Sequence, residues 1–245
     1  MVVDNKVMLI TGAAQRIGAH IAQSAHADGY NIVLHYRSSI KQTQALKEQL
    51  NAIRPNSCIS VQADFNVETT FQTMTDTIIS SFERLDVLVN NASEFFPTDL
   101  CELTNVDYEK LFGSNVKGPL FLSKACHPLL KQSSGTIINL VDIHADKPLK
   151  NYPVYSMAKA ANKMMVKALA KEYAPEIRVN GISPGCIIWP NEDISENDKT
   201  EILSRIALAK HGNEKHIYQA LIHLVNNAYI TGQIINVDGG RSLNM

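Results

Sequence analysis

Residues 7–18 read Val-Met-Leu-Ile-Thr-Gly-Ala-Ala-Gln-Arg-Ile-Gly, an apolar run that passes directly into a turn with Gly12 and Gly18. Glycines at a strand-to-helix turn let the backbone approach a pyrophosphate, and the N–H groups that open the next helix favour an anion. Two glycines also suit a simple tight turn. Because this turn follows the first apolar run and opens an amphipathic stretch, it indicates a dinucleotide-binding site.

Short apolar runs alternate with longer amphipathic stretches along the rest of the chain. Apolar residues in these stretches lie three and four apart, and Ser38 or Ser39 is suited to cap the second predicted helix. Seven runs are predicted as strands: Val7–Ile10, Asn31–His35, Ser57–Gln62, Leu85–Val89, Thr136–Val141, Arg178–Ile182 and Gln233–Val237. Apolar strands separated by helices are typical of a parallel sheet covered on both faces. We therefore expect an α/β protein, a single doubly wound Rossmann-type domain over residues 1–245.

One polar segment interrupts this alternation. Asn191–Thr200 is rich in Glu, Asp and Asn, which predicts an exposed loop or lid. No internal repeat or low-complexity linker divides the chain, so no second domain is expected.

The composition argues against several classes of protein. Lys and Arg number 23 against 24 Asp and Glu, so we expect no nucleic-acid partner and no attraction to an anionic membrane. No apolar stretch has the length of a signal-peptide core or a membrane span. Cys58, Cys101, Cys126 and Cys186 form no CxxC pair, which favours reduced thiols and a cytoplasmic location.

The end of the second predicted strand bears on the choice between NAD and NADP. His35-Tyr36-Arg37-Ser38 stands where an NAD enzyme usually places an acid for the adenosine ribose. Arg37 and Arg16 suit a 2′-phosphate, although Arg37 could also be a solvated residue at the head of a helix. Asp64 could accept a bond from adenine or cap the following helix. These residues favour NADPH as the cofactor.

Tyr155-Ser156-Met157-Ala158-Lys159 places a phenol and an ammonium at i and i+4, on one face of a helix. An ammonium about 4 Å from a phenolate is worth roughly 4 kcal/mol at an effective dielectric near 20. This interaction would lower the pKa of the Tyr155 phenol by about three units, which suits a general acid. The pair is common by chance and gains meaning beside Asn115 and Asp142.

Together these residues resemble the short-chain dehydrogenase/reductase family, from Lys6 to Leu243. The matching motifs are Thr11-Gly12 through Gly18, Asn90-Asn91-Ala92, Asn115, Tyr155-x-x-x-Lys159, Ser183-Pro184-Gly185 and Val237-Asp238-Gly239-Gly240. The resemblance implies a proton relay of Asn115, Tyr155 and Lys159, with Lys159 also bonding the nicotinamide ribose. It further implies a homotetramer packed through the helices that carry Asn115 and Tyr155.

Three departures from the common pattern are similar to the pteridine reductase branch. Arg16 replaces the middle glycine of the loop, Ser93 replaces the glycine of Asn-Ala-Gly, and Asp142 replaces the catalytic serine. The segments His35–Ser38 and Arg54–Ser57 are also similar to that branch, although its second-strand signature commonly has one more residue between the tyrosine and the arginine.

Asp142 suits a pterin better than a ketone. A serine hydroxyl polarises a carbonyl, whereas a carboxylate would repel the developing alkoxide. A pterin takes hydride at carbon and a proton at nitrogen, and its ring offers N–H donors to a carboxylate. Phe95 would stack on the pterin opposite the nicotinamide. The alternatives are core packing for Phe95 and Phe96, and a strand-end cap for Asp142.

We therefore expect an NADPH-dependent pteridine reductase that forms tetrahydropterin, with oxidised pterin and dihydrofolate as further candidate substrates. A dihydromonapterin or dihydrofolate reductase that differs near Trp189, a 3-oxoacyl or carbonyl reductase, and a non-catalytic NADP-binding regulator remain alternatives. The expected catalytic residues are Tyr155, Lys159, Asp142 and Asn115. The expected substrate-binding residues are Arg16, Ser93, Phe95, Asp142 and Tyr155. The expected cofactor-binding residues are Gly12, Arg16, Ile17, Gly18, His35, Tyr36, Arg37, Ser38, Asp64, Phe65, Asn91, Ala92, Ser93, Val141, Tyr155, Lys159, Pro184 and Gly185.

The histidines do not suggest a metal site. Asp142-x-His144-x-Asp146 superficially resembles a metal cluster, but no further ligand group stands nearby in the sequence. His216 and His223 lie two helical turns apart, roughly 10 Å along the axis, which is too far for one ion. No metal is expected.

Overall fold

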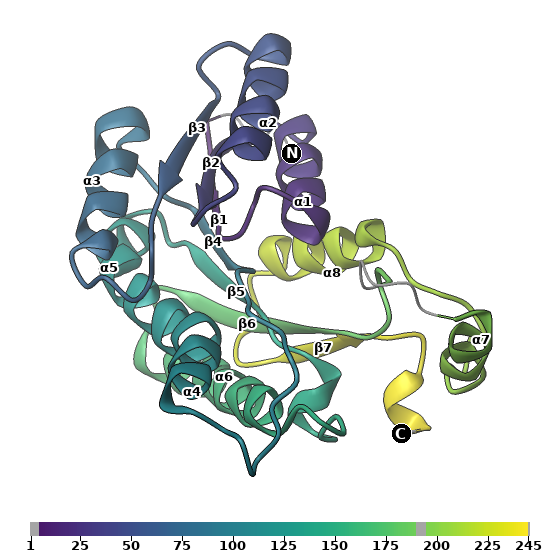
Figure 1. Cartoon of the computed structure of the whole chain (residues 1–245). Helices are drawn as coiled ribbons and strands as arrows, with labels where there is room; N and C mark the ends of the chain where they lie inside the picture. Colours follow the sequence, from purple (N-terminus) through teal and green to yellow (C-terminus); the bar gives the residue numbers. More distant parts are fainter. Residues whose placement is uncertain (1–4, 190–194, 245) are drawn as a thin grey trace.

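The computed structural model describes residues 5–189 and 195–244. These residues form a seven-stranded parallel sheet in the order β3-β2-β1-β4-β5-β6-β7 (Figure 1). The strands are β1 (Val7–Ile10), β2 (Asn31–Tyr36), β3 (Cys58–Gln62), β4 (Val87–Asn90), β5 (Thr136–Leu140), β6 (Arg178–Pro184) and β7 (Ile234–Val237). Each begins and ends within two residues of a predicted strand, so the predicted parallel α/β fold is confirmed.

Helices cover both faces of the sheet (Figure 1). One face carries α1 (Arg16–Ala27), α2 (Ile40–Ile53) and α8 (Glu214–Asn226). The other carries α3 (Thr70–Phe82), α5 (Gly118–Gln132) and α6 (Pro153–Glu172), with α4 (Asn105–Phe112) against α6. Along β1, Val7 and Leu9 pack under α3, α5 and α6, while Met8 and Ile10 pack under α1, α2 and α8. Burial on both faces explains why the strands read as unbroken apolar runs.

The polar segment Asn191–Thr200 is only partly described, and the loop prediction is wrong for its second half. Residues 196–200 belong to α7 (Glu196–Ser204), while 191–194 lie outside the described residues. The Ser195 side chain caps this helix by accepting a hydrogen bond from the backbone N–H of Asp198. This Ser-x-x-Asp capping signal was overlooked because the segment is polar throughout, as an exposed helix can be.

Three further features bear on the compositional expectations. Among the described residues, no helix combines the length and apolar character needed to cross a membrane. All four cysteines are free thiols, two of them buried. Within residues 5–189 and 195–244, no group of three or more His, Cys, Asp or Glu side chains is placed to hold a metal ion.

Candidate active site at the carboxyl edge of the sheet

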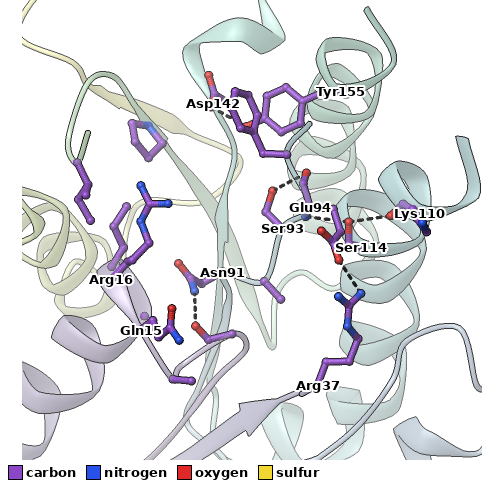
Figure 2. A pocket seen from close by; sticks show the side chains of 18 of the residues that line it. Gln15, Arg16, Arg37, Asn91, Ser93, Glu94, Lys110, Ser114, Asp142 and Tyr155 are labelled. Carbon is purple, nitrogen blue, oxygen red and sulfur yellow. Dashed lines mark hydrogen bonds and ion pairs between the residues drawn. The ribbon is translucent and has the colours of Figure 1, made fainter. Parts of the chain in front are cut away.

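A cavity of about 920 Å³ lies where the strand order reverses between β1 and β4, and the loops after β1 to β6 form its walls. Figure 2 shows Arg16 and Arg37 on opposite sides of Asn91, with Asp142 beside Tyr155. Most of the predicted site residues line this cavity: Gly12, Arg16, Ile17, Gly18, His35, Tyr36, Arg37, Ser38, Asp64, Phe65, Asn91, Ala92, Ser93, Phe95, Asp142, Tyr155, Pro184 and Gly185. Asn115, Val141 and Lys159 are buried and do not line it.

The glycine turn after β1 is held closely against the loop after β4. Gly12 has a φ of +62°, and a Cβ on Gly18 would lie 2.3 Å from the Gly12 carbonyl oxygen, so neither position tolerates a side chain. Asn91 Nδ2 donates to the carbonyl oxygens of Thr11 and Gly12, at 2.8 and 3.1 Å. This packing leaves a cradle at the N-terminus of α1 that fits the pyrophosphate of a nicotinamide dinucleotide.

Arg16 occupies a backbone conformation that favours glycine. Its φ is +54°, and its side chain is exposed to the cavity, with Nη2 3.5 Å from the carbonyl oxygen of Trp189. A non-glycine residue in this region carries strain of order 1 kcal/mol. The strain is consistent with a functional reason for an arginine at this position.

The two basic candidates at the end of β2 have different surroundings. Arg37 forms an ion pair with Glu94, at 2.6 Å between Nη1 and Oε1, across the cavity wall (Figure 2). His35 is buried, its Nδ1 accepts from the Gly12 N–H and its Nε2 donates to the Ala63 carbonyl. Burial lowers the pKa of His35 to about 4, so the ring is neutral. His35 therefore supports the glycine turn and offers no positive charge to a phosphate.

Asp64 is not the cap of a helix. Its Oδ1 accepts from the backbone N–H and from the side chain of Asn66, at 2.9 and 3.0 Å, whereas α3 begins only at Thr70. The cap interpretation is therefore wrong, and the carboxylate lines the cavity. Ser39 stands at the start of α2 as expected, but its side chain makes no capping bond.

The phenol of Tyr155 donates a hydrogen bond to Asp142 Oδ2 at 2.7 Å. Burial and the Asp142 carboxylate raise the pKa of Tyr155 well above its ordinary value, while the Ser93 hydroxyl acts in the opposite direction. The predicted lowering of this pKa by Lys159 is therefore wrong. The physical reason is that burial disfavours the charged phenolate, and that the Asp142 carboxylate, not the Lys159 ammonium, hydrogen-bonds to the phenol.

The Lys159 ammonium lies over the Tyr155 ring and makes its hydrogen bond to the backbone. Its Nζ is 5.7 Å from the ring centroid and donates to the Leu140 carbonyl oxygen at 3.0 Å. Burial lowers the pKa of Lys159 to about 8. The ammonium form therefore persists at neutral pH and is lost as the pH rises through about 8.

Asp142 is also a cap, so the alternative interpretation of this residue as a strand-end cap is confirmed. Its Oδ1 accepts from the His144 N–H at 2.8 Å at the start of a short 3₁₀ helix, Ile143–Ala145, while Oδ2 faces Tyr155. The backbone contact fixes the carboxylate group, so the second oxygen is held toward the phenol.

The Asn115 side chain contacts Ser93. This residue lies in a π-helical turn, Gly113–Lys117, between α4 and α5, and its Oδ1 accepts from Ser93 Oγ at 2.7 Å. Its carbonyl oxygen accepts from Asn162 Nδ2 at 2.6 Å, and Asn162 Oδ1 accepts from Asn139. Asn139 and Asn162 were not predicted; their only sequence signal is an amide within an apolar strand or helix.

The two neighbouring phenylalanines, Phe95 and Phe96, have different surroundings. Phe95 is 49% exposed and lines the cavity, and its ring stacks on Tyr152 and meets the edge of Tyr155, with centroids 4.5 and 4.8 Å apart. Phe96 instead packs against the buried cluster of Leu111, Val154 and Tyr155. Core packing is therefore correct for Phe96 and wrong for Phe95.

The sequence reasoning did not single out several other residues of the cavity wall. These are Glu94, Tyr152, Cys186, Ile202 and Arg241. Glu94, Cys186 and Arg241 carried a signal, because each directly follows a family motif: Ser93 of Asn-Ala-Ser, Gly185 of Ser-Pro-Gly and Gly240 of Val-Asp-Gly-Gly. Tyr152 and Ile202 belong to no such motif.

A doubly wound sheet with a phosphate cradle and a buried Tyr-Lys pair at its carboxyl edge defines an oxidoreductase of the Rossmann type. A family model described as enoyl-(acyl carrier protein) reductase matches residues 12–242, and the chain belongs to the short-chain dehydrogenase/reductase family. Members of this family typically bind NAD(P)H.

Two relatives illustrate the range of named activities. The chain is 37% identical to pteridine reductase 1 of Leishmania tarentolae, over 97% of this chain and 96% of that protein. It is 32% identical to 3-oxoacyl-(acyl-carrier-protein) reductase FabG of Staphylococcus aureus strain N315, over 96% of this chain and 97% of that protein. The comparison supports a reductase and leaves its substrate to be argued from the site.

Proposed function

We propose that the protein is an NADPH-dependent pteridine reductase that converts a dihydropterin to its tetrahydro form. The observation that carries the proposal is the Asp142 carboxylate, 2.7 Å from the phenol of Tyr155, where the family's ketone reductases have a serine. An anion at this place opposes the charge that grows on a carbonyl oxygen during ketone reduction. The same anion accepts hydrogen bonds from the N–H groups of a pterin ring. The 37% identity to a pteridine reductase supports the same choice.

In this mechanism the bound nicotinamide supplies the hydride. Tyr155 holds the proton on its phenol oxygen, because burial and Asp142 keep its pKa high. Ring N–H groups of the pterin pair with Asp142, which draws the carboxylate's charge away from the phenol and makes it a stronger acid. Tyr155 then donates its proton to the ring nitrogen, and the Lys159 ammonium stabilises the phenolate that remains.

Stacking supports the choice of a flat substrate. Phe95 presents an exposed ring to the cavity close to Tyr155, and Tyr152 covers one of its faces. Ser93 lies between these rings and Asn115, which holds its hydroxyl in place. Arg16 contributes a guanidinium from the opposite wall (Figure 2). We assign Phe95, Ser93 and Arg16 to pterin binding.

The proposal is tested by NADPH oxidation with a panel of biopterin, dihydrobiopterin, dihydromonapterin, folate, dihydrofolate and an acetoacetyl thioester. Turnover of one or more dihydropterins, at a kcat/KM well above that of the thioester, is the expected result. Turnover of the thioester alone would contradict the proposal and favour a 3-oxoacyl reductase. No NADPH consumption with any of these would favour a binding protein.

The cofactor choice rests on Arg16 and Arg37, and the first test replaces Arg37. Arg37→Asp places a carboxylate beside the expected 2′-phosphate, so kcat/KM for NADPH should fall about 10-fold or more, while that for NADH is retained. Glu94→Gln is the matched variant: it releases Arg37 from its ion pair and should lower the KM for NADPH. Steady-state kinetics with both cofactors measures each effect. If Arg37→Asp left the selectivity for NADPH over NADH unchanged, recognition of the 2′-phosphate would be assigned to Arg16 instead.

Replacing Arg16 tests its role in ligand binding separately from its effect on protein stability. Arg16→Gly relieves the strain at φ +54° but adds freedom to the unfolded chain, so the free energy of unfolding should change by less than about 1 kcal/mol. The KM values for NADPH and for dihydropterin should nevertheless rise about 10-fold, because a charge-assisted contact is lost. Denaturant unfolding and kinetics on the same preparation provide both measurements. A large loss of stability with normal kinetics would contradict a binding role for Arg16.

We also propose a homotetramer in the cytoplasm. Large apolar side chains are exposed on α5, at Leu120 and Phe121, and on α6, at Met157 and Met164, which supports packing between copies through these helices. The free thiols fit a reducing compartment.

A further inference from the structure

The C-terminal segment brings a guanidinium into the cavity from the β7 edge of the sheet. Arg241 opens a short 3₁₀ helix, Arg241–Leu243, just after β7, at the far edge of the sheet from β2 and β3. It lines the same cavity as Cys186, Trp189 and Ile202. Arg16 and Arg37, in contrast, follow β1 and β2. Arg241 is therefore poorly placed for the phosphates of the adenosine half.

Arg241 has no counter-ion among residues 5–189 and 195–244. No carboxylate of this part of the chain forms an ion pair with it, and its Nε is buried without a hydrogen-bond partner. The Cys186 thiol lies within hydrogen-bond reach, but burial raises the pKa of this thiol, so it stays neutral. By comparison, the Arg37 guanidinium forms an ion pair with the Glu94 carboxylate. A partly buried, unpaired guanidinium is costly unless a ligand satisfies it.

The backbone on both sides of Arg241 is fixed. Asp238 Oδ1 accepts from the Gly240 N–H at 2.9 Å, and Asp238 Oδ2 accepts from the Ser242 N–H at 2.8 Å. Lys147 Nζ donates to the Ser242 carbonyl oxygen at 2.8 Å. These contacts engage the Asp238 carboxylate and the Lys147 ammonium with the backbone and fix the chain on both sides of Arg241.

We propose that Arg241 binds a carboxylate on the side chain of the substrate, away from the ring that is reduced. This inference rests on the proposed pteridine reductase function. The planar guanidinium matches a carboxylate with two parallel hydrogen bonds. Trp189 and Ile202 line the same cavity and suit an aromatic ring between the pterin and the carboxylate. The site therefore favours folate-type pterins, with a benzoyl-glutamate side chain, over pterins with a neutral side chain.

The first test compares dihydrofolate with dihydrobiopterin in Arg241→Gln. The variant keeps a polar side chain and loses the charge, so the KM for dihydrofolate should rise about 10-fold more than the KM for dihydrobiopterin. Arg241→Lys, which keeps the positive charge, should recover part of the preference for dihydrofolate over dihydrobiopterin. Lys131→Gln is the control, because it removes one positive charge from an exposed ion pair with Glu176 outside the cavity lining. An equal rise in both KM values, or weaker NADPH binding, would overturn the inference.

The second test does not depend on turnover. Trp189 is the single tryptophan of the chain and lines the cavity, so its fluorescence reports ligands there. p-Aminobenzoyl-glutamate carries the carboxylates but no reducible ring, and it should quench Trp189 saturably, with a Kd about 10-fold weaker in Arg241→Gln. Reduction of dihydropterins with no effect of Arg241→Gln in either test would overturn this inference alone. Absence of pterin reduction with intact fragment binding would overturn only the proposed reaction.

Discussion

Replacing Tyr155 with phenylalanine is expected to lower kcat for dihydropterin reduction by about 10²- to 10⁴-fold, the usual contribution of a positioned general acid. The variant retains the ring that meets Phe95 and deletes the hydroxyl that donates to Asp142 at 2.7 Å. The Kd of NADPH should change little, since only the phenol oxygen is lost. Single-turnover kinetics and a fluorescence titration with NADPH measure the two quantities.

Tyr108→Phe is the matched control, because this exposed tyrosine of α4 lies outside the cavity lining. Its kcat should remain near that of the unmodified protein. A Tyr155→Phe variant with nearly normal kcat would show that water or Asp142 delivers the proton, and the assignment of Tyr155 as the acid would then be wrong.

The second large effect is expected at Asp142 and separates a pterin substrate from a ketone. Asp142→Ser should lower pterin reduction by about 10²-fold or more, because the carboxylate that holds the Tyr155 phenol is lost. The same change restores the hydroxyl that ketone reduction requires, so activity toward an acetoacetyl thioester should be kept or raised. Parallel kinetics on both substrates measure the difference.

Serine is a suitable residue for this test because it can also fill the second role of Asp142, which is to cap a helix. The carboxylate also caps the 3₁₀ helix Ile143–Ala145 through the His144 N–H, and serine is a good cap. Stability should therefore be retained, which denaturant unfolding can verify. Asp142→Asn retains the shape and removes the charge. Undiminished pterin turnover in both variants would refute the role given to the carboxylate.

Much of the candidate site could be predicted because of how parallel sheets are built. Loops that follow neighbouring parallel strands meet at one edge, so Gly12, Arg37, Asn91, Asp142 and Pro184 converge although they are far apart in the chain. Each of these positions carried a local signal: a glycine turn, a basic strand end or a family motif. The helix α7 was missed because a fully polar helix has no apolar stripe to reveal it.

The sequence by itself determined the succession of strands along the chain and many of the residues that border the cavity. These depend on apolar spacing and on turn chemistry, which act over a few residues. Only the tertiary structure decided how the charged groups pair and ionise. Tyr155 meets Asp142 rather than Lys159, Arg37 pairs with Glu94, and Arg241 has no such partner among the described residues. Ionisation and pairing depend on burial and on groups that folding brings together from distant segments, and no local pattern in the chain specifies them.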